Sequence, residues 1–169
     1  MKLEIVQGDI SQCKADAIVN AAGTSLAMGS GVAGALRRRG GEELHRAAVA
    51  QGPIGLGQVA VTPAFGLDAQ YVIHAAAMPH YGDGRATTDS IREATRQSLF
   101  KAEELGCTSI VFPALGCGIA GFPLAEGLRI MLQVIMGFSP KNLQICRLVL
   151  YTSDDLAVAQ EVYRDLSEG

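Results

Sequence analysis

Apolar and polar residues alternate at the start of the chain, where Leu3 and Ile5 alternate with Lys2 and Glu4. A period of two places one set on each side of a strand, so residues 2–7 are predicted to form a half-buried strand. Other short segments are mostly apolar, which is typical of strands buried on both faces of a sheet. These predicted strands are residues 15–20, 58–62, 71–75, 108–113 and 148–151.

Between the strands, apolar residues recur with the spacing of one helix face. Pro123 suits the first position of a helix, and Ser153 is a suitable N-cap for the last one. The predicted helices are residues 32–39, residues 42–51, a segment from Thr87 to Gly106, a segment opened by Phe122 and Pro123, and residues 154–166. Strands that alternate with helices of this length predict an α/β sandwich with helices on both faces. A length of 169 residues predicts one domain, residues 1–169.

Residues 15–34 contain the clearest functional pattern of the chain. The strand that ends at Asn20 is followed by a loop with Gly23, Gly29 and Gly31, and a helix can begin at Val32. Glycines let a backbone approach a ligand closely, and a helix N-terminus presents free N–H groups to it. The pattern therefore predicts a phosphate-binding loop.

A second glycine-rich loop, residues 114–121, follows the strand at residues 108–113. Asp9 follows the first strand in the same way. Ligands of open α/β sheets bind outside the carboxyl ends of the strands. We expect the two loops to hold the two phosphates of one diphosphate, with Asp9 accepting a hydrogen bond from a neutral donor such as the exocyclic amine of a base.

Residues 29–34 also satisfy the dinucleotide fingerprint G-x-G-x-x-G. That fingerprint requires glycines directly after the strand and an acidic residue about 20 positions later. Here eight residues separate Asn20 from Gly29, and the segment around residues 48–51 has no carboxylate. An NAD-dependent oxidoreductase is therefore disfavoured.

The charge of the chain narrows the choice of partners. Its formal net charge is −3, which argues against broad binding to nucleic acid or a membrane surface, because that binding needs clustered Lys and Arg. Arg37, Arg38 and Arg39 form the only basic run, and they are expected to lie on a solvated helix face. An anionic ligand is therefore expected to be held by backbone amides.

Four cysteines occur, at positions 13, 107, 117 and 146, with no C-x-x-C pair and no histidine at metal-ligand spacing. Neither a metal, a disulfide framework nor a cofactor is predicted. The sequence shows no signal peptide and no apolar span of 18 residues, so a cytoplasmic protein without membrane contact is expected.

Several residues allow two interpretations. Asp9 fits a ligand acceptor or the cap of a following turn, and Tyr151 by its position alone fits the edge of the core. His74 ends a strand and is interpreted as a core histidine rather than a base. Cys117 lies between glycines near a helix N-terminus, where a thiolate is stabilised, yet cysteine is commonly a small packing residue.

The motifs resemble the macro domain family in their order and spacing over nearly the whole chain. They are Gly8-Asp9-Ile10, residues 16–22, Gly29-Ser30-Gly31-Val32, Val72-Ile73-His74, and Phe112-Pro113 with residues 116–123. The resemblance implies a three-layer α/β/α sandwich with a mixed central sheet that binds ADP-ribose, free or attached to a protein. The ligand-binding residues that it implies are Asp9, Ile10, Asn20, Ser30, Gly31, Val32, Gly116, Cys117, Gly118, Ile119, Ala120, Gly121 and Tyr151.

Within the resemblance, Asp9 would accept from the adenine amine with Ile10 beside it, and Tyr151 would stack on the base. Two departures concern catalysis. Family members that hydrolyse ADP-ribosyl links usually carry Asn where this chain has Gly23, and many carry Asp where it has Ala33. The sequence therefore favours a binding module over the alternative, a hydrolase that removes ADP-ribosyl, acetyl or phosphate groups at the distal ribose.

Overall fold

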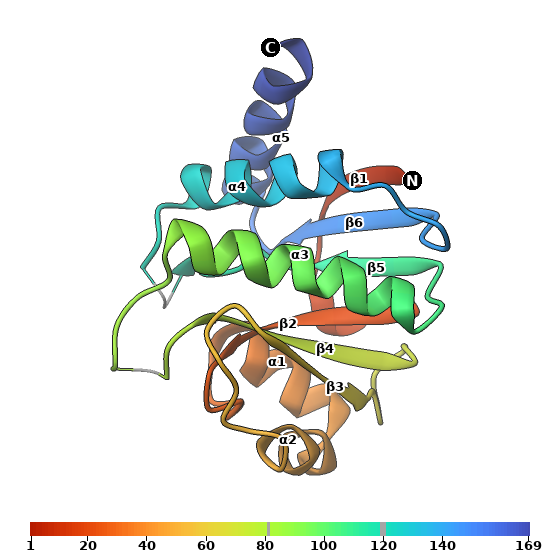
Figure 1. The fold of residues 1–169 in the computed structure, drawn as a ribbon, viewed down its shortest axis with the longest axis vertical. Coiled ribbons are helices and arrows are strands. Elements are labelled where there is room, and N and C mark those ends of the chain that lie inside the picture. The colour runs from red at the N-terminus through yellow and green to blue at the C-terminus, as the bar shows by residue number, and fades with distance from the viewer. Residues whose placement is uncertain (81, 119–120) are drawn as a thin grey trace.

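The computed structural model describes residues 1–80, 82–118 and 121–169. One six-stranded sheet has the order β1-β6-β5-β2-β4-β3, in which all neighbouring pairs are parallel except β3 with β4 (Figure 1). The strands are β1 (Lys2–Gln7), β2 (Ala17–Gly23), β3 (Val59–Pro63), β4 (Tyr71–Met78), β5 (Ser109–Phe112) and β6 (Ile145–Leu150). The helices are η1 (Ile10–Gln12), α1 (Gly31–Gly40), α2 (Glu42–Val49), α3 (Thr88–Glu104), α4 (Leu124–Gly137) and α5 (Ser153–Glu168).

The central strand β2 divides the core into two layers. Ala17 and Val19 point into the cluster formed with α3, α4 and α5, whereas Ile18 points into the cluster formed with α1 and α2. All three side chains are completely buried, as expected for a strand covered on both faces. This arrangement confirms the predicted α/β/α sandwich with a mixed sheet.

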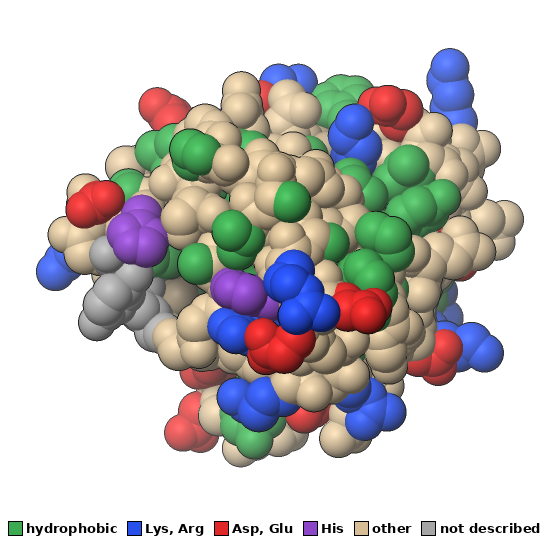
Figure 2. All heavy atoms as spheres, turned by 90° about the horizontal axis from the view of Figure 1, so that it is seen from below, with side chains coloured by type: hydrophobic (Ala, Val, Ile, Leu, Met, Phe, Trp, Pro, Cys, Tyr) green, Lys and Arg blue, Asp and Glu red, His purple; other side chains and the backbone are tan. Residues whose placement is uncertain are grey.

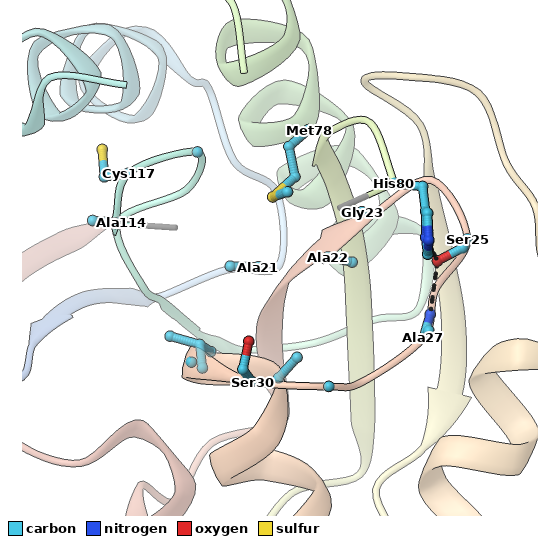
Figure 3. Close-up of a pocket in the computed structure, with 16 residues that line it drawn as sticks. Ala21, Ala22, Gly23, Ser25, Ala27, Ser30, Met78, His80, Ala114 and Cys117 are labelled. Carbon is cyan, nitrogen blue, oxygen red and sulfur yellow. Dashed lines mark hydrogen bonds between the residues drawn. The ribbon is translucent and has the colours of Figure 1, made fainter. Parts of the chain in front are cut away.

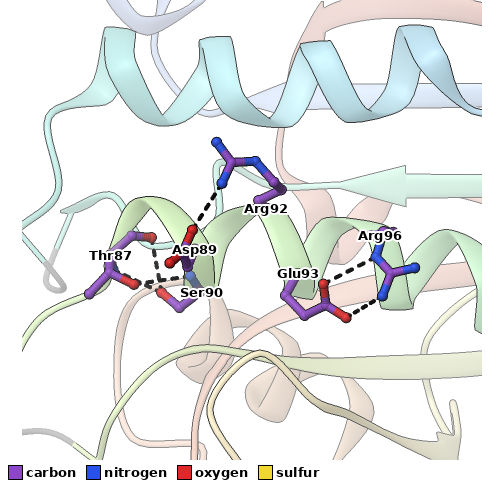
Figure 4. A network of polar contacts seen from close by, with 6 residues as sticks. All are labelled: Thr87, Asp89, Ser90, Arg92, Glu93 and Arg96. Carbon is purple, nitrogen blue, oxygen red and sulfur yellow. Dashed lines mark hydrogen bonds and ion pairs between the residues drawn. The ribbon is translucent and has the colours of Figure 1, made fainter.

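The predicted start of α3 is confirmed by its capping interactions. Thr87 Oγ1 accepts from the backbone N–H of Ser90, and Ser90 Oγ accepts from the backbone N–H of Thr87, so the two residues form a capping box (Figure 4). Ion pairs Arg92–Asp89 and Arg96–Glu93 lie on the exposed face of the helix. Exposed pairs of this kind add at most about 1 kcal/mol each, so the buried face is what fixes α3.

Some predicted boundaries are wrong. Thr152 rather than Ser153 caps α5, because its Oγ1 accepts from the N–H of Asp155 at 3.1 Å. Pro123 is the N-cap of α4 and not its first helical residue. Strands β2 and β4 continue beyond their predicted ends, to Gly23 and Met78, so both strands carry the chain further toward the carboxyl edge of the sheet.

Candidate functional site

A groove runs along the carboxyl edge of the parallel strands. It consists of two adjoining cavities of about 520 and about 530 Å³, each large enough for a drug-sized ligand. We call them the Gly23 half, which includes Gly23, Ser25 and His80, and the Asp9 half, which includes Asp9 and Tyr151. The lining residues that both halves share are Gly31, Val32, Ala114, Cys117 and Gly118. Both glycine-rich loops therefore meet at the junction of the two halves.

Asp9 lies at the end of β1 and lines the Asp9 half together with Ile10. Its Oδ1 accepts from the N–H of Ser11 at 2.9 Å and from Ser11 Oγ at 2.7 Å, which caps η1. Both bonds use one carboxylate oxygen, and no described residue donates to the other, Oδ2. The capping interpretation is therefore confirmed, and it leaves an acceptor for a ligand.

The loop before α1 is held in place by buried side chains. Leu26 and Met28 are completely buried, the N–H of Met28 donates to His45 Nδ1 at 3.2 Å, and Arg37 Nη1 donates to the Met28 carbonyl at 3.0 Å. Ser30 is the N-cap of α1, yet its side chain makes no capping bond. The first amides of α1, at the junction of the halves, therefore keep their N–H groups for a ligand.

In the second loop, Gly116 has a φ of +75°, a conformation that favours glycine. A Cβ atom at this position would lie 2.8 Å from Ala86 Cβ and from Ile91 Cγ1, so the loop packs tightly against the start of α3. Gly116, Cys117 and Gly118 line the groove as predicted, whereas Gly121 is not in the lining that the structure describes. The predicted residues Ile119 and Ala120 lie outside the described residues.

Cys117 is a packing residue in this structure. Its Sγ contacts the backbone of α4 so closely that a Cβ at Gly127 would lie 2.6 Å from it. Burial, and secondarily the nearby Asp155, raise the pKa of the Cys117 thiol to about 11. The thiol is therefore protonated near neutral pH, which disfavours the nucleophile interpretation.

Asn20 and His74 form a buried polar pair below the groove. Asn20 Nδ2 lies 3.0 Å from His74 Nδ1, and Thr62 Oγ1 lies 3.0 Å from His74 Nε2. Burial lowers the pKa of His74 to about 4. The prediction that His74 is a core histidine is confirmed, whereas the fully buried Asn20 lies outside the lining of both described halves.

Tyr151 follows β6 and is 76% exposed, so the core-edge interpretation is wrong. Arg38 is exposed as expected for a solvated helix face, yet it also lines the Asp9 half together with Asp155. Sequence reasoning did not find these two charged lining residues. The available signal for Arg38 was its position about two helical turns after the glycine-rich loop.

Gly23 lies against the backbone that follows β4. A Cβ atom at Gly23 would lie 2.9 Å from the Pro79 carbonyl oxygen, so a side chain there requires this backbone to move. His80, the residue after Pro79, lines the Gly23 half, and its Nδ1 lies 2.9 Å from Ser25 Oγ (Figure 3). This Ser25–His80 pair was also missed, because the strand was predicted to end at residue 75, five residues before His80.

Comparisons with known proteins agree with this arrangement. The Macro domain family matches residues 19–131. An uncharacterised protein of Saccharolobus solfataricus is 40% identical over 171 residues, which covers 98% of this chain and 94% of that protein. Because a family match covers more than half of the chain, the chain belongs to the macro domain family.

Solved structures of the same fold include ligand complexes. A mutant of the Oceanobacillus iheyensis macrodomain with ADPR superposes with a TM-score of 0.90 at 30% identity, covering 99% of this chain and 94% of that chain. The Trypanosoma brucei macrodomain in complex with ADP-ribose has a TM-score of 0.84 at 27% identity, covering 95% and 68%. The family resemblance and the fold predicted from the sequence are thus both confirmed.

Charged side chains of both signs are mixed on the surface of the protein (Figure 2). On the face seen in Figure 2, Lys and Arg side chains lie among Asp and Glu side chains rather than in one basic patch. Arg37 and Glu42, for example, form an ion pair at 2.7 Å. Among the helices of the described residues, none is long and apolar enough to cross a membrane. The same part of the chain contains no group of three or more side chains suited to a metal ion.

Proposed function

We propose that this protein binds ADP-ribose, either free or attached to a protein. The observation that carries the proposal is the meeting of both glycine-rich loops at the junction of the two halves. A diphosphate at this junction would have a nucleoside on one side and a second ribose on the other. Related macrodomain structures that contain ADPR or ADP-ribose support this choice of ligand.

We assign the adenosine to the Asp9 half. The free Oδ2 of Asp9 suits the adenine amine, and the exposed ring of Tyr151 offers a surface for the base. Stacking of a base on an aromatic side chain contributes about 1–3 kcal/mol. The diphosphate would then be held mainly by backbone N–H groups, because Arg38 is the one Lys or Arg in the described lining.

Hydrolysis at the distal ribose is the second candidate function. Gly23 and Ala33, which both line the Gly23 half, provide no polar side chain. The Ser25–His80 pair favours this candidate, because it is a hydrogen-bonded polar pair in the half assigned to the distal ribose. The group removed would be an ADP-ribosyl, acetyl or phosphate group.

Titration calorimetry with ADP-ribose tests the binding proposal. We expect one binding site per chain and a dissociation constant in the micromolar range, which corresponds to a binding free energy of about −8 kcal/mol. An absence of binding at millimolar ADP-ribose would contradict the proposal. Incubation with an ADP-ribosylated protein then distinguishes the two candidates, since a binding module retains the modification and a hydrolase releases it.

A further inference from the structure

The Ser25–His80 pair lies at the end of the Gly23 half that is remote from Asp9 and Tyr151. Neither residue lines the Asp9 half, and Figure 3 shows both on the opposite side of the cavity from Cys117. The backbone of His80 is fixed as well, because its N–H donates to Thr24 Oγ1 at 3.1 Å. Two hydrogen bonds to the loop after β2 therefore position His80.

The proton arrangement of the pair depends on the second partner of Ser25, the N–H of Ala27. Ser25 Oγ accepts from the N–H of Ala27 at 3.3 Å and retains a second lone pair (Figure 3). If His80 Nδ1–H donates to that lone pair, Nε2 carries the free lone pair of the neutral imidazole. In this arrangement Ser25 orients the ring, and Nε2 can take a proton from water.

The absence of a side chain at Gly23 affects the position of His80. A Cβ at Gly23 would lie 2.9 Å from the carbonyl oxygen of Pro79, the residue before His80. The missing side chain therefore lets the Pro79 backbone approach the end of β2. This approach brings His80 to the cavity wall next to Ser25.

The remaining lining limits the chemistry of the Gly23 half. Its described residues include no carboxylate, and the raised pKa of the Cys117 thiol, about 11, leaves it protonated. Glycosidic cleavage commonly uses two carboxyl groups, which this lining does not provide. Hydrolysis of a carboxylate ester needs only one imidazole, which takes a proton from the attacking water and returns it to the leaving alcohol.

We propose that His80 is the general base, and Ser25 its positioning residue, for hydrolysis of a carboxylate ester on the distal ribose. The inference rests on the proposed binding of ADP-ribose. Water attacks the ester carbonyl carbon while His80 Nε2 takes one of its protons. The bond between the acyl carbon and the ribose oxygen then breaks, and the imidazolium returns the proton to that oxygen. The products are a carboxylic acid and ADP-ribose.

Two substrates carry the same ester chemistry, and both belong in the test. One is O-acetyl-ADP-ribose, and the other is a peptide with ADP-ribose esterified to a glutamate. Turnover of the first alone assigns a free metabolite as the source of the ester, and turnover of the second alone assigns a modified protein. Turnover of either substrate or of both supports the inference, provided that it depends on His80.

The variants separate catalysis from binding. His80→Ala should lower kcat by about 100-fold or more, while calorimetry shows unchanged affinity for ADP-ribose. Added imidazole should restore part of the lost rate, which a merely structural role would not allow. Ser25→Ala should lower kcat about tenfold with little change in KM, whereas Ser25→Thr keeps the hydroxyl and the rate. Ser167→Ala is the matched control, because Ser167 lies near the end of α5 and its Oγ donates to the Tyr163 carbonyl.

Two results would overturn the inference while leaving the proposed function intact. One is a wild-type protein that binds ADP-ribose but hydrolyses neither ester. The other is a His80→Ala variant that binds ADP-ribose and hydrolyses an ester at the wild-type rate. Failure of the wild-type protein to bind ADP-ribose would instead overturn the proposed function, and the inference with it.

Discussion

The two halves of the groove differ in the side chains that they offer to a ligand. The Asp9 half contains two carboxylates, an arginine and an exposed tyrosine, whereas small residues surround one histidine–serine pair in the Gly23 half. Charged and aromatic groups can select a base by hydrogen bonding and stacking. Small residues leave room for a variable substituent. Our two proposals place affinity mainly in the Asp9 half and chemistry in the Gly23 half, so mutations should separate them.

The largest effect is expected in the second glycine-rich loop, beside the junction of the halves. Gly116→Ala should lower the free energy of unfolding by about 2–4 kcal/mol, because it combines a positive φ with contacts of 2.8 Å to Ala86 and Ile91. Gly118→Ala is the matched control, because its φ is also +75° and no described atom lies within 4 Å of its Cβ. It should cost only about 1–2 kcal/mol. Urea denaturation measures the free energy of unfolding of both variants. Equal losses of stability in the two variants would contradict the tight packing at Gly116.

The buried His74 should make the strands under the Gly23 half sensitive to acid. Its pKa of about 4 lies below the ordinary value of 6.5, so the unfolded chain takes up a proton at a higher pH than the folded chain. The stabilisation is complete above pH 6.5 and is lost as the pH falls toward 4, by about 3 kcal/mol in total.

Urea denaturation from pH 7.5 to pH 4 tests this prediction against His74→Gln, which cannot take up the proton. The variant should be less stable at neutral pH but should lose less of its stability on acidification. The same pH dependence in both proteins would show that His74 is not held neutral in the fold.

In the Asp9 half, Asp9→Ala should weaken ADP-ribose binding by about 1.5–3 kcal/mol, the range for a hydrogen bond to a charged group. Asp9→Asn is a sharper variant, because its carbonyl oxygen can still accept from Ser11 while the negative charge is removed. We expect Asp9→Asn to retain the melting temperature and lose affinity in calorimetry. Unchanged affinity in both variants, with a lower melting temperature for Asp9→Ala, would leave capping as the only role.

Tyr151→Ala should weaken ADP-ribose binding by about 1–3 kcal/mol through the loss of stacking. The melting temperature should not change, because the side chain is 76% exposed. Tyr151→Phe is the control that keeps the ring and should bind as the wild type does. Equal affinity of Tyr151→Ala and the wild type would place the base elsewhere in the groove.

The layers of the fold and the position of the groove could be predicted from the sequence. Hydrophobic patterns located each strand, and the segments that follow three of them, namely Asp9, the loop with Gly23, Gly29 and Gly31, and residues 114–121, located the carboxyl edge. The Ser25–His80 pair could not be predicted, because it joins residues that lie 55 positions apart across a loop. Local patterns report on neighbours in the chain and on helix or strand periodicity, not on such contacts.

The contact that requires glycine at position 23 could not be predicted from the sequence either. A positive φ is the usual reason for a glycine after a strand, but among the described residues Gly23 is not one of the glycines with positive φ. The contact with the Pro79 carbonyl is what excludes a side chain. Replacement of Gly23 by Asn, the residue usual in hydrolysing family members, would therefore move the Pro79–His80 backbone as well.

The central claim is that the groove is shaped for ADP-ribose along its whole length, and titration calorimetry with three ligands tests it most directly. ADP-ribose, AMP and NAD are titrated into the same preparation. AMP should bind more weakly because it fills little more than the Asp9 half. NAD should bind more weakly still, because its positively charged nicotinamide would lie in the Gly23 half, whose described lining has no carboxylate to pair with it. Equal affinities for ADP-ribose and NAD would contradict the account.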